Sequence, residues 1–134
     1  MSDPNDPQVV YTIGMQGPSG LPMSWQGALA ITPAQSPYSA KILQPVPVDC
    51  RTGGVTVQLP ALTDSSTCVV AIKDLYGASA ANNIGILPVA GLGTTVEVPG
   101  SLGTFESTTV IASNGAVVWY VAMFSINAWV IWVN

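Results

Sequence analysis

The side chains that most often carry out chemistry in proteins are scarce in this chain. It has no histidine, and its two cysteines are Cys50 and Cys68. Histidine is the commonest general base, and without an imidazole a cysteine or serine nucleophile lacks its usual activating partner. Two cysteines without histidine also cannot supply the four ligands of a structural zinc site. The composition therefore excludes Ser-His-Asp and Cys-His catalysis.

Carboxylates remain as candidate catalytic groups, because a pair of them can hydrolyse a glycosidic bond. The nearest pairs along the sequence are Asp64 with Asp74 and Glu97 with Glu106, and neither lies in a recognisable motif. The run Gly91–Gly93 lacks the third glycine and the following helix of a dinucleotide site, so it predicts a turn. We expect a protein that is not an enzyme, with no cofactor, no metal and no small-molecule substrate.

The chain is unusually poor in charge. Charged residues make up 7% of it and apolar residues 49%, whereas ordinary soluble domains are roughly 25% charged. Its basic residues are Lys41, Arg51 and Lys73, too few to neutralise a phosphate backbone, which argues against nucleic acid as a partner. Large uncharged patches usually mark contact surfaces. We therefore expect an obligate oligomer, or a subunit that lies on a larger body.

The termini predict synthesis in the cytoplasm and no membrane partner. The first residues lack Lys, Arg and a continuous apolar run, so no secretory signal is expected, and Cys50 and Cys68 are predicted to be buried thiols in preference to a disulfide. Residues 116–133 carry no charge over 18 positions, near the length of a membrane span. Ser125 and Asn127 interrupt this stretch, and its Val, Trp and Ile content favours two paired strands.

Two parts of the chain differ in composition. Residues 1–24 are rich in Pro and Gly and are predicted to form an extended arm, and residues 25–134 a β-domain. The strand-like run of the arm, and its predicted contact with a larger body, consists of Gln8, Val9, Val10, Tyr11, Thr12 and Ile13. Gly14, Gly17 and Gly20 then recur at every third position, which we interpret as a glycine-rich turn; the alternative is a contact in which three polyproline-like chains meet at one axis, which this spacing also suits.

In the second part, short apolar segments are separated by Pro and Gly, which excludes long helices. The predicted strands are Val55–Leu59, Val69–Lys73, Ile84–Leu87, Thr94–Val98, Thr108–Ala112, Ala116–Phe124 and Trp129–Val133. Asn114 and Gly115 predict a tight hairpin between two of them, because both tolerate positive φ. Turns at about 8–12-residue spacing favour an all-β fold, a single compact antiparallel sandwich or barrel.

The tryptophans can anchor a core or an interface, or stack on sugars. Trp119 is predicted to lie in the core, and Trp129 and Trp132 to face opposite sides of one strand because their spacing is odd. The predicted subunit interface consists of Gly14, Gly17, Gly20, Trp25, Trp129 and Trp132.

An ordered set of strand and turn motifs covers somewhat over half the chain. The motifs are Gly54–Pro60, Val69–Asp74 with Gly77, Asn82–Pro88 with Gly91, and Ser113–Gly115 with Trp119–Val121. This set resembles a domain common in tail-fibre, head-fibre and capsid-decoration proteins of tailed bacteriophages. The resemblance implies a virion structural role, usually trimeric, with no catalytic residues to carry over.

Fibres of that kind bring a long shaft, which this chain lacks, so it looks more like a capsid decoration (cement) protein. The resemblance then implies a homotrimer on the outer surface of the capsid, with the major capsid protein as its other partner. The alternative is a fibre or spike module that recognises host surface glycans through exposed Trp or Tyr side chains.

Overall fold

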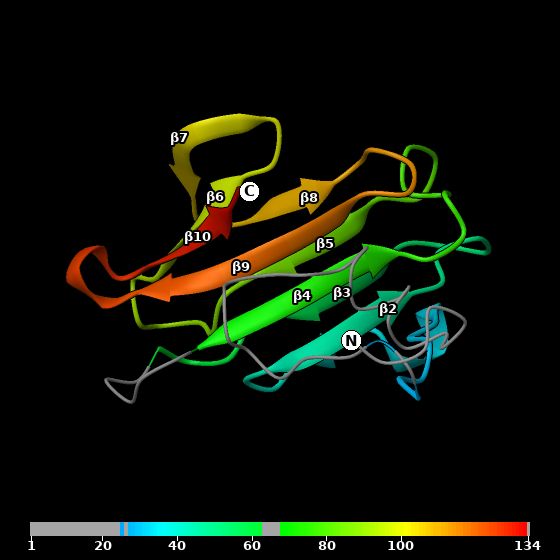
Figure 1. The fold of residues 1–134 in the computed structure, drawn as a ribbon, viewed down its shortest axis with the longest axis horizontal. Helices are drawn as coiled ribbons and strands as arrows, with labels where there is room; N and C mark the ends of the chain where they lie inside the picture. The colour runs from blue at the N-terminus through cyan, green and yellow to red at the C-terminus, as the bar shows by residue number, and fades with distance from the viewer. Residues whose placement is uncertain (1–24, 26, 63–67, 134) are drawn as a thin grey trace, which may run out of the picture.

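The computed structural model describes residues 25, 27–62 and 68–133, which form two β-sheets packed face to face (Figure 1). The smaller sheet has the order β1 (Tyr38–Ser39), β3 (Val55–Gln58), β5 (Ile84–Leu87), β8 (Thr109–Ile111). The larger sheet has the order β2 (Gln44–Val48), β4 (Val69–Asp74), β9 (Val117–Met123), β10 (Ala128–Trp132), β6 (Thr95–Val98), β7 (Ser101–Glu106). Two single 3-10 turns, η1 (Pro33–Gln35) and η2 (Phe124–Ile126), are the helical elements of the described residues, and neither is long enough to cross a membrane. The all-β prediction is confirmed, with a sandwich-like architecture.

The prediction of an antiparallel sandwich is wrong, because both sheets are mixed. The pairs β1 with β3, β3 with β5, β2 with β4, and β6 with β10 are parallel, whereas β4, β9 and β10 pair antiparallel. From β1 to β6 the chain alternates between the two sheets. The chain therefore leaves a sheet, forms one strand in the other sheet and comes back. As a result β3 runs parallel to β1, β4 to β2, and β5 to β3. The spacing of the sequence motifs predicts where the strands lie but not their alternation between the two sheets.

The turn at Asn114 and Gly115 is a corner between the sheets and not the predicted hairpin. The strand before it, β8, pairs with β5 in the smaller sheet, and the strand after it, β9, pairs with β4 in the larger one. Gly115 has φ +76°, so the need for positive φ is real, but the flanking strands diverge. The predicted strand pair within residues 116–133 is confirmed: β9 and β10 pair antiparallel across Val121 and Val130.

The core lies between the sheets and follows the period-two pattern of the strands. Alternate residues Val55 and Val57 of β3 face inward and are buried, and Tyr120 and Trp129 are its largest fully buried side chains. Cys50 and Cys68 are both buried and are not joined in a disulfide, as predicted. Burial, and then the nearby Asp74 charge, raise the pKa of the Cys50 thiol, so this sulfur is kept in its unreactive protonated form.

Three strands were not predicted from the sequence: the two-residue β1, and the edge strands β2 and β7 of the larger sheet. β2 contains Pro45 and Pro47, which lack the N–H that a central strand needs, and it accordingly lies at an edge of the larger sheet. β7 lies at the opposite edge and is exposed along its whole length. Its pairing with β6 shifts register between Glu97 and Val98, so the strand bulges away from the sheet.

The packing predicts opposite outcomes for two neighbouring residues of the smaller sheet. Replacing the buried Ile86 by Ala (Ile86→Ala) should lower the free energy of unfolding by about 3 kcal/mol, because it removes buried methyl groups and leaves a cavity. Thr56→Ala, on the half-exposed position of the adjacent strand, should change it by less than about 0.5 kcal/mol. Urea unfolding of both variants measures the difference; equal effects would contradict the assigned inward face.

Candidate interaction surface

The larger sheet has a second apolar side, which we call the outer face: the side turned away from the smaller sheet. In β4, β9 and β10 the residues that alternate with core residues point to this side. Its apolar members are Val69, Ala71, Val117, Trp119, Val121, Met123, Ala128, Val130 and Trp132. Lys73, near the end of β4, points to the same side and donates from its Nζ to the carbonyl of Gly115 at 2.9 Å. An outer sheet face is polar in an ordinary monomeric sandwich. This one is apolar across three adjacent strands apart from Lys73.

One part of the outer face is already buried. Val69, Ala71 and Trp119 form a small cluster, against which Trp25 and Leu43 pack. Trp119 is 7% exposed and Ala71 is fully buried, although both point away from the core. The prediction that Trp119 is buried is therefore confirmed, but it belongs to this second cluster and not to the main core.

The other part of the outer face is open. Trp132 lies directly opposite Trp119 across the β9–β10 ladder and is 42% exposed. Val121 and Val130, also directly opposite each other, are half-buried, and Met123 continues the apolar surface to the end of β9. The exposed apolar side chains of β9 and β10 are thus contiguous with a buried aromatic cluster. Contiguous apolar surface of this kind marks a contact site.

Glu97 borders the outer face, and both of its carboxylate oxygens accept hydrogen bonds from backbone N–H groups. Its Oε2 accepts the N–H of Gly103 at 2.6 Å, and its Oε1 accepts the N–H of Ile131 at 2.8 Å. These bonds fix the β7 bulge and the end of β10. Glu106 pairs opposite Val96, one position out of phase with Glu97, so the two carboxylates lie on opposite sides of the sheet. They do not form the carboxylate pair that glycoside hydrolysis requires.

Asp74 is likewise structural, and it connects two loops. Its carboxylate accepts backbone N–H groups from Ala78 (3.1 Å), Ser79 (3.0 Å) and Gly115 (2.9 Å). Burial would raise the pKa of Asp74, but these three hydrogen bonds outweigh it and lower the pKa to about 2. The other member of its suggested pair, Asp64, lies outside the described residues.

A second polar group of residues is exposed. Arg51 forms an ion pair with Asp49 at 2.9 Å, and its guanidinium stacks 3.7 Å from the ring centroid of Tyr76. The side-chain hydrogen bond from Arg51 lowers the pKa of Asp49. Tyr76 is about half exposed, so one aromatic ring at this end of the sandwich is held in a fixed orientation while facing solvent.

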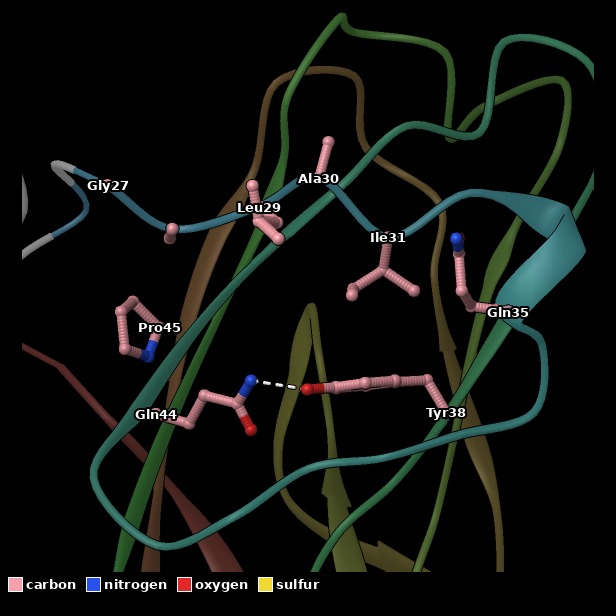
Figure 2. A pocket seen from close by; sticks show the side chains of 9 residues that line it. Gly27, Leu29, Ala30, Ile31, Gln35, Tyr38, Gln44 and Pro45 are labelled. Carbon is pink, nitrogen blue, oxygen red and sulfur yellow. Dashed lines mark hydrogen bonds between the residues drawn. The ribbon is translucent and has the colours of Figure 1, made fainter.

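An open groove of about 750 Å³ lies between residues 27–31 and the start of β2 (Figure 2). Its polar side chains already have partners within the chain. Gln44 donates to the Tyr38 hydroxyl and accepts from the Lys41 N–H, and Gln35 accepts from the N–H and hydroxyl of Thr32. The described residues that line the groove include no carboxylate and no cation. Its chemistry permits binding but offers no acid–base group.

The structure places the predicted interface tryptophans in three different environments. Trp25 packs on the outer face, Trp132 is exposed on it, and Trp129 is fully buried in the core. Trp129 and Trp132 do face opposite sides, as their spacing predicts. A fully buried Trp129 has no surface to offer another subunit, so it is left out of the interface proposed below. The predicted contacts Gln8–Ile13, and Gly14, Gly17 and Gly20, lie outside the described residues.

Sequence reasoning singled out Trp132 on the outer face but not its apolar neighbours Val121 and Val130. The signal was available in the continuous apolar composition of β9 and β10, which is typical of strands buried on both sides. Among the described residues no three His, Cys, Asp or Glu side chains lie together as a metal site would require. Comparison with protein-family models and with curated proteins found no match to this chain.

The pKa of Asp74 predicts how stability depends on pH. Its folded-state pKa of about 2 lies below the ordinary 3.8, so its contribution is fully present above about pH 4 and is lost as the pH falls through 2. Asp74→Asn should lower the free energy of unfolding at pH 7 by about 2 kcal/mol and flatten its decline between pH 4 and 2. Chemical denaturation at several pH values measures both effects.

Asp49→Asn is the matched control for this prediction, because Asp49 forms an exposed ion pair. That variant should retain most of the decline between pH 4 and 2. Parallel pH profiles for Asp74→Asn and the unchanged protein would contradict the role given to Asp74.

Proposed function

We propose that this chain is a non-enzymatic structural protein of a tailed-bacteriophage virion. In this proposal it is a capsid decoration (cement) protein that binds the head lattice as a homotrimer. Its partners are its own copies and the major capsid protein, and its place is the outer surface of the capsid. The ordered motifs from Gly54 to Val121 support the virion role through their resemblance to phage decoration and fibre domains.

The observation that carries the proposal is the open half of the outer face. Val121, Val130 and Trp132 form an apolar surface at the middle of the larger sheet, next to side chains that are already buried. Covering such side chains with another protein stabilises the complex by about 25 cal/mol per Å² of apolar area. This surface supports packing between copies. The sites of Glu97 and Asp74, whose oxygens bind backbone N–H groups, support a scaffold role over a catalytic one.

The arm would then hold the trimer on the capsid. Residues Gln8–Ile13 have the composition of a strand and carry no charge, so they suit addition to a sheet edge of a capsid subunit through main-chain hydrogen bonds. Three arms on one trimer act together, and their combined hold can exceed that of a single arm by about 10²–10⁴-fold. The function is mechanical: it ties neighbouring capsid subunits together.

A second candidate function is favoured by one observation, the fixed and exposed Tyr76 ring. With Arg51 on one side, its position suits stacking against a sugar, as in a receptor-binding module at a fibre tip. A glycan array separates the two functions. Binding that is lost in Tyr76→Ala would favour the receptor module over the decoration protein.

Removing residues 1–13 should lower capsid affinity by about 10²-fold or more, because the three arm contacts are lost together. Co-sedimentation with capsids that lack the protein measures the effect, with thermal unfolding as the check that the domain stays folded. Val10→Pro, which removes a main-chain donor, should weaken binding, and Val10→Thr, which retains it, should not. Full capsid occupancy by the shortened protein would end the proposal for the arm.

A further inference from the structure

We propose that the buried part of the outer face is a docking surface for residues 14–24 of the same chain. The surface consists of Val69, Ala71, Trp119 and Val117, with Trp25 at its border. This inference does not rest on the proposed function. It concerns a contact within one chain and holds whether or not the protein decorates a capsid.

Trp25 is the first described residue of the chain, and it lies on the outer face. Trp25 packs against the cluster of Val69, Ala71 and Trp119, and its indole Nε1 is shielded from solvent without a hydrogen-bond partner among the described residues. A turn follows at once, because the N–H of Ala28 donates to the carbonyl of Trp25 at 3.1 Å and Gly27 has φ +83°. The described part of the chain therefore begins on the outer face, at Trp25.

Among the described residues, few apolar side chains from outside β4 and β9 pack on the buried cluster of the outer face. Trp119 is a large side chain on an outward position, and its exposure of 7% is that of a core residue. The described apolar side chains packed on the cluster are Trp25, Leu43, Val117 and Val121. Val117 and Val121 are outward-facing neighbours in the same strand as Trp119, so they border it at the level of the sheet and do not lie over it.

The composition and length of residues 14–24 fit this surface. The segment contains Met15, Leu21 and Met23, and the chain carries no charged residue between Asp6 and Lys41. An uncharged segment can lie on an uncharged face without burying an unpaired charge. Extended, its eleven residues span up to about 36 Å, and neighbouring strands are about 4.8 Å apart. The segment is thus long enough to cross β4, β9 and β10 from Trp25.

Amide hydrogen exchange of the full-length protein, followed by mass spectrometry, tests the contact. In the unchanged protein the amides of residues 14–24 should exchange at least about tenfold more slowly than those of the same segment as a free peptide. Val117→Ser should reduce that protection by about tenfold while the amides of β3 and β5 keep theirs. Val110→Ser, at an exposed position of the smaller sheet, is the matched control and should leave residues 14–24 protected.

A second measurement identifies which copy supplies the segment. The variant Met23→p-benzoylphenylalanine is prepared in light and ¹⁵N-labelled forms, which are mixed, unfolded, refolded together so that each oligomer contains both, and irradiated. Cross-links to the peptide containing Trp119 should join light with light and heavy with heavy. Mixed cross-links would assign the surface to a neighbouring copy and overturn the proposal. Free-peptide exchange rates in the unchanged protein, or equal effects of Val117→Ser and Val110→Ser, would overturn it as well.

Discussion

The fold depends on one buried carboxylate, that of Asp74 at the end of β4. From there the chain crosses to β5 in the smaller sheet, and later it returns from β8 to β9 at Gly115. The first crossing buries Ser79 and half-buries Ala78, and an unmade hydrogen bond of a buried N–H group costs about 1–3 kcal/mol. Asp74 accepts N–H groups from each crossing, and the Asn114 side chain accepts the N–H of Ala80 beside it. The alternation between sheets is held at this point.

A consequence of the alternation is that the larger sheet has two apolar sides. One side faces the smaller sheet and forms the core around Tyr120 and Trp129. The other carries Trp119 and Trp132, one buried and one exposed, in directly paired positions. A sheet with few charges on either side is stable in water only where something covers it. The scarcity of charge in the sequence and the apolar outer face thus both indicate a sheet that is covered on both sides.

The sequence predicted the strands well where local rules decide them. The range Ile84–Leu87 is reproduced residue for residue as β5, because Pro88 follows it and the β-branched Ile84 and Ile86 alternate along it. Pairing was predicted less well. Asn114-Gly115 satisfies the local rules of a hairpin, but the partner of each flanking strand is fixed by distant contacts such as that between Asp74 and Gly115. Two parallel partners that are separated in sequence by a strand of the other sheet leave no local sequence signal of their pairing either. For the surface, residue types indicated an interface, whereas only the register shows that Trp129 is buried and Trp132 is not.

The central claim is that the open half of the outer face is covered by other copies of the chain. Sedimentation equilibrium of the purified full-length protein over a wide concentration range tests it most directly. The account predicts a species of three times the 13.8 kDa chain mass that persists on dilution to low micromolar concentration. A monodisperse, soluble monomer at high concentration, with Trp132 still accessible to a collisional quencher, would contradict it.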